Sequence, residues 1–290
     1  MPDGLLTDVL IYPIKSCRRV AVDSVQITPL GLDGDRRWQV VNDAGQPITQ
    51  RQHRILATVR PEPTPGGLLV SAPGANTVEL ADPGPTDTEV RSNFGVTLPA
   101  ADGGPEAAAW FSELLSEECR IVGIGKGPGW RLPPELDMFG QSAAFADAAP
   151  VLVATTSSLA WLQERASDLF GMERFRPNLV VENDEPWVED TWGEFRIGQA
   201  ALKLGAPWPR CAIPQIDQDT AGRHKEPAKV LRKHRWCVSA PSVDEGLRSL
   251  LEGNALFGIG CSIGPEGSMI EVGDQVEVTV FADPVLATPV

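Results

Sequence analysis

Residues 5–12 (LLTDVLIY) and 20–28 (VAVDSVQIT) largely alternate apolar with polar side chains. A period of two is typical of strands that bury one face in a core. The stretch 37–49 (RWQVVNDAGQPIT) predicts two further strands joined by an Asn-Asp-Ala-Gly turn. Three more short strands are expected, at 67–71, 76–81 and 88–92. The first third of the chain is therefore predicted to be built from short strands.

Helices are expected at only three places. PEAAAWFSELLSE (105–117) predicts a helix with Pro105 in its first turn. A second helix is predicted from residue 156 or 157 to about 169, and a basic one near 225–235. The Gly- and Pro-rich residues 124–136 predict a loop.

The remaining strands complete the expected fold. PVLVAT (150–155) predicts a buried strand, and further strands are expected at 177–182, 194–204 and 275–280. We therefore expect an α+β fold dominated by short strands in barrel-like sheets. The predicted division is a β-rich N-terminal module (1–125) and a second domain (126–290), into which the N-terminal strands can pack.

Composition narrows the class of protein. The 290 residues carry a formal net charge of −14, so binding to nucleic acid or to an anionic membrane is not expected. Neither a secretory signal nor an apolar run long enough to span a bilayer is visible, which predicts a soluble, cytoplasmic protein. The five cysteines are an odd number and widely spaced, which favours reduced thiols.

Several familiar sites are excluded by spacing. No cysteine pair or histidine pair has the separation of a common zinc site. The glycine-rich stretches 123–129 and 258–264 match neither dinucleotide nor P-loop patterns. DQDTAG (217–222) begins like a calcium loop but places alanines where oxygen ligands are needed.

The charge is unevenly distributed. Residues 15–60 hold eight basic and four acidic side chains, a net charge of +4, and residues 203–235 hold eight and three, a net charge of +5. Two basic regions in an acidic chain suit a small anionic ligand such as a phosphate, although solvated surface charge is the plainer interpretation. The second region contains Cys211 beside Arg210 between prolines. A cationic neighbour favours the thiolate, which attacks electrophiles or binds a soft metal.

Six motifs together resemble the MOSC family, in the form that joins an N-terminal barrel module to a C-terminal MOSC domain. They occur in the family's order: YPIKSC (12–17), GLDGDRRW (31–38), TQRQ (49–52), FRPNLVV (175–181), WPRC (208–211) with Asp217 and Thr220–Gly222, and EVGDQVEV (271–278). Among members of this family, the chain resembles the amidoxime-reducing components and their bacterial relatives. The resemblance spans nearly the whole chain.

The resemblance implies a molybdenum cofactor, a pterin dithiolene with a terminal phosphate. Cys211 falls on the position of the protein's metal ligand, and a thiolate is a suitable ligand for this metal. Other positions fall where the family holds the pterin and its phosphate: Lys15, Ser16, Arg36, Arg176 and Asn178, with Arg210 and the helix-opening Ser158 as further candidates.

The implied activity is reduction of N-hydroxylated compounds such as amidoximes, hydroxylamines and N-hydroxylated bases by oxygen abstraction at molybdenum. Asp217 is a candidate proton donor or orienting residue, or else a turn residue. Trp208 stands where several relatives carry a second cysteine, which leaves the substrate preference open. No cysteine cluster typical of an iron–sulfur domain is visible, so we expect a separate electron donor such as a ferredoxin, a cytochrome b5-like protein or a flavin reductase.

Two alternatives remain at this point. Cys211 could carry a persulfide in cofactor sulfuration, or the chain could bind and deliver the cofactor without catalysis. The three functions differ in their need for bound molybdenum and in what becomes of the Cys211 sulfur.

Overall fold

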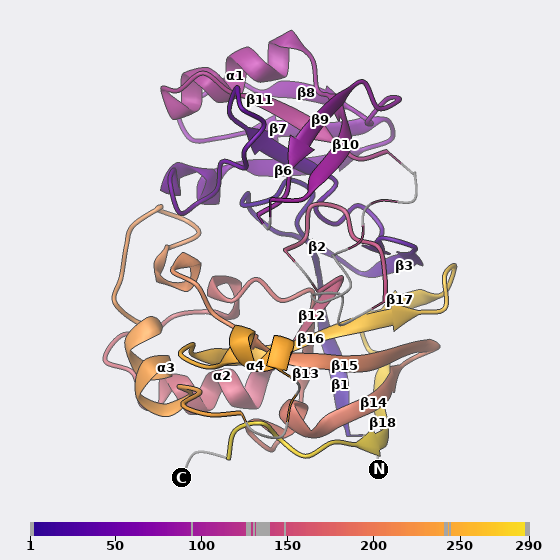
Figure 1. Cartoon of the computed structure of the whole chain (residues 1–290), viewed down its shortest axis with the longest axis vertical. Coiled ribbons are helices and arrows are strands. Elements are labelled where there is room, and N and C mark those ends of the chain that lie inside the picture. The colour runs from indigo at the N-terminus through magenta and orange to yellow at the C-terminus, as the bar shows by residue number, and fades with distance from the viewer. Residues whose placement is uncertain are drawn as a thin grey trace.

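The computed structural model describes residues 3–93, 95–125, 129, 131, 140–147, 149–240, 243 and 245–287. Seven of the described strands close into a barrel, because the first strand pairs at both of its edges (Figure 1). Their order around the barrel is β13 (Leu179–Glu182), β12 (Val151–Thr155), β16 (Leu256–Gly264), β15 (Ala200–Pro209), β14 (Trp192–Ile197), β18 (Gln275–Phe281) and β1 (Gly4–Ile11).

The N-terminal strand β1 closes this barrel. It pairs antiparallel with β13, placing Leu6 opposite Val181, and with β18, placing Leu5 opposite Gln275. The short β2 (Val20–Val22) extends the sheet along β1. The predicted strand is therefore confirmed, although the register shifts between Leu6 and Asp8 and strict alternation is lost there. Leu6, Val9 and Ile11 enter a core to which the C-terminal strands contribute.

The barrel interior is filled by buried aliphatic and aromatic side chains. These include Leu6, Val9, Val151, Val153, Val181, Trp192, Phe195, Ile197, Leu202, Ile259 and Val276. All five residues of β12 are buried, as its continuous apolar run predicts.

A second β-rich body lies beyond the barrel, at the top of Figure 1. One of its sheets has the order β5 (Trp38–Val41), β11 (Arg120–Gly123), β10 (Thr97–Asp102) and β9 (Thr88–Arg91). The other has the order β6 (Arg60–Thr64), β7 (Gly67–Ser71) and β8 (Val78–Ala81). Helix α1 (Pro105–Leu115) buries Ala107, Phe111 and Leu115 against a core shared by both sheets. A small sheet of β17 (Met269–Glu271), β3 (Ser24–Thr28) and β4 (Gly31–Leu32) lies between the two bodies (Figure 1).

Several predicted elements differ from the structure. The alternating stretch 20–28 is two strands, β2 and β3, which pair with different partners. Of the two strands predicted over 37–49, only β5 is found in this described stretch, and Pro47 forms an isolated bridge.

Helix α2 spans Thr156–Gln163 and stops well before Leu169, whose side chain is 85% exposed and offers no core contact to continue the helix. The strand predicted over 194–204 is two strands, because the chain reverses at Gly198, where φ is +55°. Two shorter helices, α3 (Ala228–His234) and α4 (Glu245–Leu251), complete the fold.

The α+β, barrel-containing fold class is thus confirmed. The division at residue 125 stays a prediction, and most of the expected loop 124–136 lies outside the described residues. Within the described ranges, no helix has the length and apolarity needed to cross a membrane.

Replacing a buried barrel phenylalanine is expected to be costly. Phe195→Ala removes a side chain that is 1% exposed in the barrel core, and it should lower the free energy of unfolding by about 3–5 kcal/mol. Phe281→Ala, in the neighbouring strand but 65% exposed, is the matched control and should cost less than about 0.5 kcal/mol. Urea unfolding of both variants measures the difference, and equal losses would contradict the assignment of the core.

Candidate functional site

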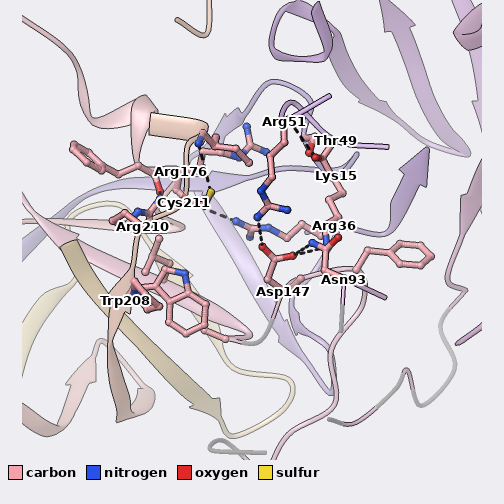
Figure 2. Close-up of a pocket in the computed structure, with 18 of the residues that line it drawn as sticks. Lys15, Arg36, Thr49, Arg51, Asn93, Asp147, Arg176, Trp208, Arg210 and Cys211 are labelled. Atoms are coloured by element: carbon pink, nitrogen blue, oxygen red, sulfur yellow. Dashed lines mark hydrogen bonds and ion pairs between the residues drawn. The ribbon is translucent and has the colours of Figure 1, made fainter. Parts of the chain in front are cut away.

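A cavity of about 310 Å³ is lined by residues of the barrel and of the segments that adjoin the N-terminal strands (Figure 2). Its basic residues come from five separate chain segments: Lys15 follows β1, Arg36 precedes β5, Arg51 follows β5, Arg176 precedes β13 and Arg210 follows β15. Seven of the nine residues predicted from the sequence line this cavity: Lys15, Ser16, Arg36, Arg176, Asn178, Arg210 and Cys211. The fold therefore concentrates positive charge at one place in an acidic chain.

Three of these residues adopt a backbone conformation that favours glycine. The φ angles are +67° at Ser16, +48° at Arg36 and +55° at Arg176. Such a conformation costs a non-glycine residue on the order of 1 kcal/mol, so it persists only where surrounding contacts fix it. Strain gathered at one cavity is typical of functional sites.

Tyr12 provides some of the contacts that hold Arg36 and Arg176 in place. The guanidinium groups of Arg36 and Arg176 lie over its ring, 4.7 and 4.2 Å from the centroid, and its hydroxyl donates to the Pro177 carbonyl at 2.9 Å. Burial raises the pKa of Tyr12 to about 12, so it stays neutral. Burial lowers the pKa of Arg176 to about 10, which leaves it charged at neutral pH.

Asn178 connects the strands behind the cavity. Its Oδ1 accepts from the Leu152 backbone N–H and from Arg36 Nη1, each at 3.1 Å, and its Nδ2 donates to the Leu10 carbonyl at 3.1 Å. Arg36 also forms an ion pair with Asp35. Burial opposes the charge of Arg36, but Asp35 outweighs it and raises the pKa of this guanidinium. Asn178 thus positions Arg36, in addition to lining the cavity.

Asp147 is the acidic residue of this basic cavity (Figure 2). Its Oδ1 lies 2.7 Å from Lys15 Nζ, and its Oδ2 lies 3.8 Å from Arg51 Nη2. Burial opposes ionisation of Asp147, but Lys15 and Arg51 outweigh it and hold the carboxyl pKa below its usual range. Burial lowers the pKa of Lys15, and Asp147 offsets this only in part.

Arg210 has unused hydrogen-bonding capacity. Its Nη2 donates to the Phe175 carbonyl at 2.6 Å, and its backbone N–H donates to the Ala255 carbonyl at 2.8 Å. Its buried Nε and Nη1 have no partner among the described residues. Burial lowers its pKa to about 10, so the group is a cation at neutral pH with N–H donors on two nitrogens to offer an anion.

Cys211 differs from the other cysteines. All five lie in the described ranges, and Cys211 alone is exposed. Its Sγ accepts from the Ile213 backbone N–H at 3.5 Å. Burial opposes the charge of Arg51, but contact with Cys211 and Asp147 raises the pKa of this guanidinium. The cavity thus combines an accessible sulfur with several cations.

Trp208 lines the cavity on the Cys211 side. The space for its indole is provided by Gly260, where an added Cβ would lie 2.6 Å from Trp208 Cε3. Phe145, Phe175 and Ile213 also contribute apolar surface, so the cavity lining combines aromatic and cationic side chains.

Two residues named from the sequence lie outside the lining of this cavity. Ser158 is fully buried at the start of α2, where its hydroxyl donates to Glu189 Oε2 at 2.9 Å. Asp217 Oδ1 accepts from the backbone N–H and hydroxyl of Thr220, both at 2.8 Å, and its Oδ2 pairs with Arg174 at 2.8 Å. Burial opposes ionisation of Asp217, yet the Thr220 hydrogen bonds lower its pKa, and these contacts support a role in the turn.

Sequence reasoning did not single out Arg51, Asp147, Thr49 or Asn93 as site residues, although all four line the cavity. Arg51 and Thr49 belong to the TQRQ motif, so the family resemblance could have identified them. Asp147 and Asn93 lie in unremarkable segments, and only the tertiary fold brings them to Lys15.

Glu189 should make stability depend on pH. Burial first, and then the neighbouring Asp190, raise its pKa to about 7. The folded state therefore holds a proton that the unfolded chain releases, so stability is full below about pH 4.5 and falls as the pH rises to about 7. Glu189→Gln, which keeps an acceptor for Thr155 and Ser158, should be more stable than the natural chain by about 1–3 kcal/mol at pH 8 and similar at pH 4.5. Urea unfolding at both pH values tests this, and a constant difference would contradict it.

Comparison with known proteins identifies the family. Residues 3–118 match the MOSC N-terminal beta barrel domain and residues 140–277 match the MOSC domain. The chain is 33% identical to mitochondrial amidoxime reducing component 2 of Rattus norvegicus over 286 residues, covering 94% of this chain and 82% of that protein. It is 34% identical to the Homo sapiens protein of the same name, covering 94% and 83%, and 30% identical to molybdenum cofactor sulfurase of Danio rerio, covering 79% of this chain and 30% of that protein. With both domains matched in order and relatives aligned over most of its length, this chain belongs to the MOSC family.

Proposed function

We propose that this chain is a molybdenum-cofactor-dependent oxidoreductase that reduces N-hydroxylated compounds such as amidoximes, hydroxylamines and N-hydroxylated bases. The observation that carries the proposal is the exposed Cys211 in a cavity lined by five basic residues, of which Lys15 and Arg176 are buried. The names of the mitochondrial amidoxime-reducing relatives support the same activity.

The cations suit the anionic part of the cofactor. The Nε and Nη1 of Arg210 have no partner among the described residues, and Lys15 Nζ pairs with the Asp147 carboxylate, which an incoming phosphate can replace. Arg36 and Arg176 are held in place by Tyr12 and Asn178 before any ligand arrives, so less ordering is needed on binding. We propose that these four residues, with Ser16 and Asn178, hold the cofactor.

Cys211 would supply the protein's thiolate ligand to the metal. When bound, the molybdenum cofactor supplies the oxygen abstraction, in which two electrons and two protons convert an N–OH group into N–H and water. The protein's residues bind and orient, with Trp208 and Phe145 forming an apolar wall for the organic part of the substrate. We assign no proton transfer to Asp217, because its carboxylate is engaged in the turn.

The electrons would come from a separate protein, for which a ferredoxin, a cytochrome b5-like protein or a flavin reductase are the proposed classes. The match to a molybdenum cofactor sulfurase supports a second function, in which Cys211 carries a persulfide during cofactor sulfuration. A non-catalytic cofactor carrier is the third.

Cys211→Ala should remove the metal and the activity together, because no second cysteine is exposed. We expect the natural chain, made in a molybdate-supplied host, to hold close to one molybdenum per chain and to reduce benzamidoxime with a chemical electron donor. The variant should lose most of its molybdenum and at least about 100-fold in rate. Cys119→Ala, at a buried thiol far from the cavity lining, is the matched control and should keep both.

The outcomes separate the three functions. Natural protein that contains no molybdenum and cannot be loaded contradicts the oxidoreductase. Cyanide-labile sulfur on Cys211 without bound metal favours sulfuration. Cofactor that exchanges readily, with no turnover from any donor, favours the carrier.

A further inference from the structure

Two buried glutamines join the Cys211 loop to the N-terminal body. Gln50 lies between Thr49 and Arg51, and Gln218 lies seven positions after Cys211, in the segment between β15 and α3. Their side-chain amides form a reciprocal pair, with Gln50 Nε2 donating to Gln218 Oε1 at 3.0 Å and Gln218 Nε2 donating to Gln50 Oε1 at 3.1 Å. Exposure is 0% for Gln50 and 3% for Gln218.

Both amides use their full donor capacity. The second N–H of Gln50 donates to the Ser16 carbonyl at 2.7 Å, and the second N–H of Gln218 donates to the Ile216 carbonyl at 3.1 Å. Gln218 Oε1 accepts a second hydrogen bond, from Arg176 Nη1 at 3.3 Å. A fully satisfied buried network holds its members in one arrangement, whereas loss of one member leaves the others with unpaired polar groups.

Several branches of this network reach the candidate site. Ser16 and Arg176 line the cavity, and Gln50 is flanked by the cavity residues Thr49 and Arg51. The Gln218 backbone carbonyl accepts from Arg18 Nη1 at 3.3 Å, which is a further link from the Cys211 loop to the segment after Lys15.

We propose that Gln218, acting with Gln50, is a positioning residue that fixes the loop carrying Cys211 relative to the cations of the cavity. Neither amide lines the cavity, so both act through the residues they hold. The Cys211 sulfur follows the barrel strand β15, whereas Lys15, Ser16 and Arg51 come from chain segments before β6. A ligand that contacts all of them therefore needs their spacing to be fixed before it binds. This role in the cofactor's binding rests on the function proposed above, but the mechanical coupling does not.

The alternative is that the pair contributes only to general stability. Gln39 provides the matched control, because it is also a fully buried glutamine, and its Nε2 donates to the Arg91 carbonyl at 3.4 Å, away from the cavity lining. Its Oε1 has no partner among the described residues, so Gln39→Leu removes one long hydrogen bond and one unpaired acceptor. Any effect of this variant should fall on overall stability and not on the Cys211 loop in particular.

Hydrogen exchange on cofactor-free protein tests the coupling. Gln218→Ala should speed amide exchange in residues 211–222 and 49–52 by about tenfold or more, while the barrel strands keep their protection. Gln218→Glu keeps the acceptors for Gln50 Nε2 and Arg176 and loses both donors, so it should fall between alanine and the natural residue. Unchanged exchange in 211–222, or a uniform increase like that of Gln39→Leu, would overturn the proposal.

The loaded protein provides a second readout. We expect Gln218→Ala to release the cofactor at least about tenfold faster and to shift the electron paramagnetic resonance signal of the bound molybdenum, which depends on the placement of Cys211. Gln39→Leu should change neither. A natural protein that holds no molybdenum would refute the proposed function, yet the exchange experiment would still decide the coupling. Natural protein that holds molybdenum, with an unchanged signal and release rate in Gln218→Ala, refutes the positioning role.

Discussion

The antiparallel pairing of β1 with β13 is the constraint on which the site depends. It places the segment after β1 beside the segment before β13, although more than 150 positions separate Lys15 from Arg176 along the chain. Leu10 N–H donates to the Asn178 carbonyl at 2.7 Å, and Arg176 Nη1 donates to the Cys17 carbonyl at 2.8 Å. The same strand pairing therefore closes the barrel and brings Lys15 and Arg176 to the cavity.

Bringing these cations together is electrostatically unfavourable, and the fold offsets the cost locally. Asp35 pairs with Arg36, Asp147 pairs with Lys15, and the Tyr12 ring lies against both Arg36 and Arg176. Arg210 lacks such compensation at two of its nitrogens among the described residues. Buried cations with unused donors are stabilised by an anion that reaches them, so ligand binding and the stability of this region are linked. The net charge of −14 describes the rest of the surface and conceals this site.

Much of the fold and part of the site could be predicted from the sequence, for identifiable reasons. Strands such as β1 can be predicted because apolar and polar residues largely alternate in their sequence. The motif residues Lys15, Arg36 and Cys211 line the same cavity. The length of the helix that begins at Thr156 depends on whether Leu169 packs in the core, and the local sequence does not show this. Asp147 pairs with Lys15 only through the fold, and Ser158 is bound to a buried Glu189 that no spacing rule would reveal. The sequence thus indicates residue types and local motifs, but it does not indicate which residues distant in the chain contact one another.

The position of β1 also constrains how the protein can be made. Of its two partners within the barrel, β13 begins at Leu179 and β18 begins at Gln275. A ribosome therefore releases β1 long before either barrel partner exists, and at that stage β1 can pair only with β2 while the N-terminal sheets form. The described lining of the cavity is complete only after Asn254 has been synthesised. A ligand that contacts both sides of the cavity must therefore enter after the barrel strands up to β16 have been made.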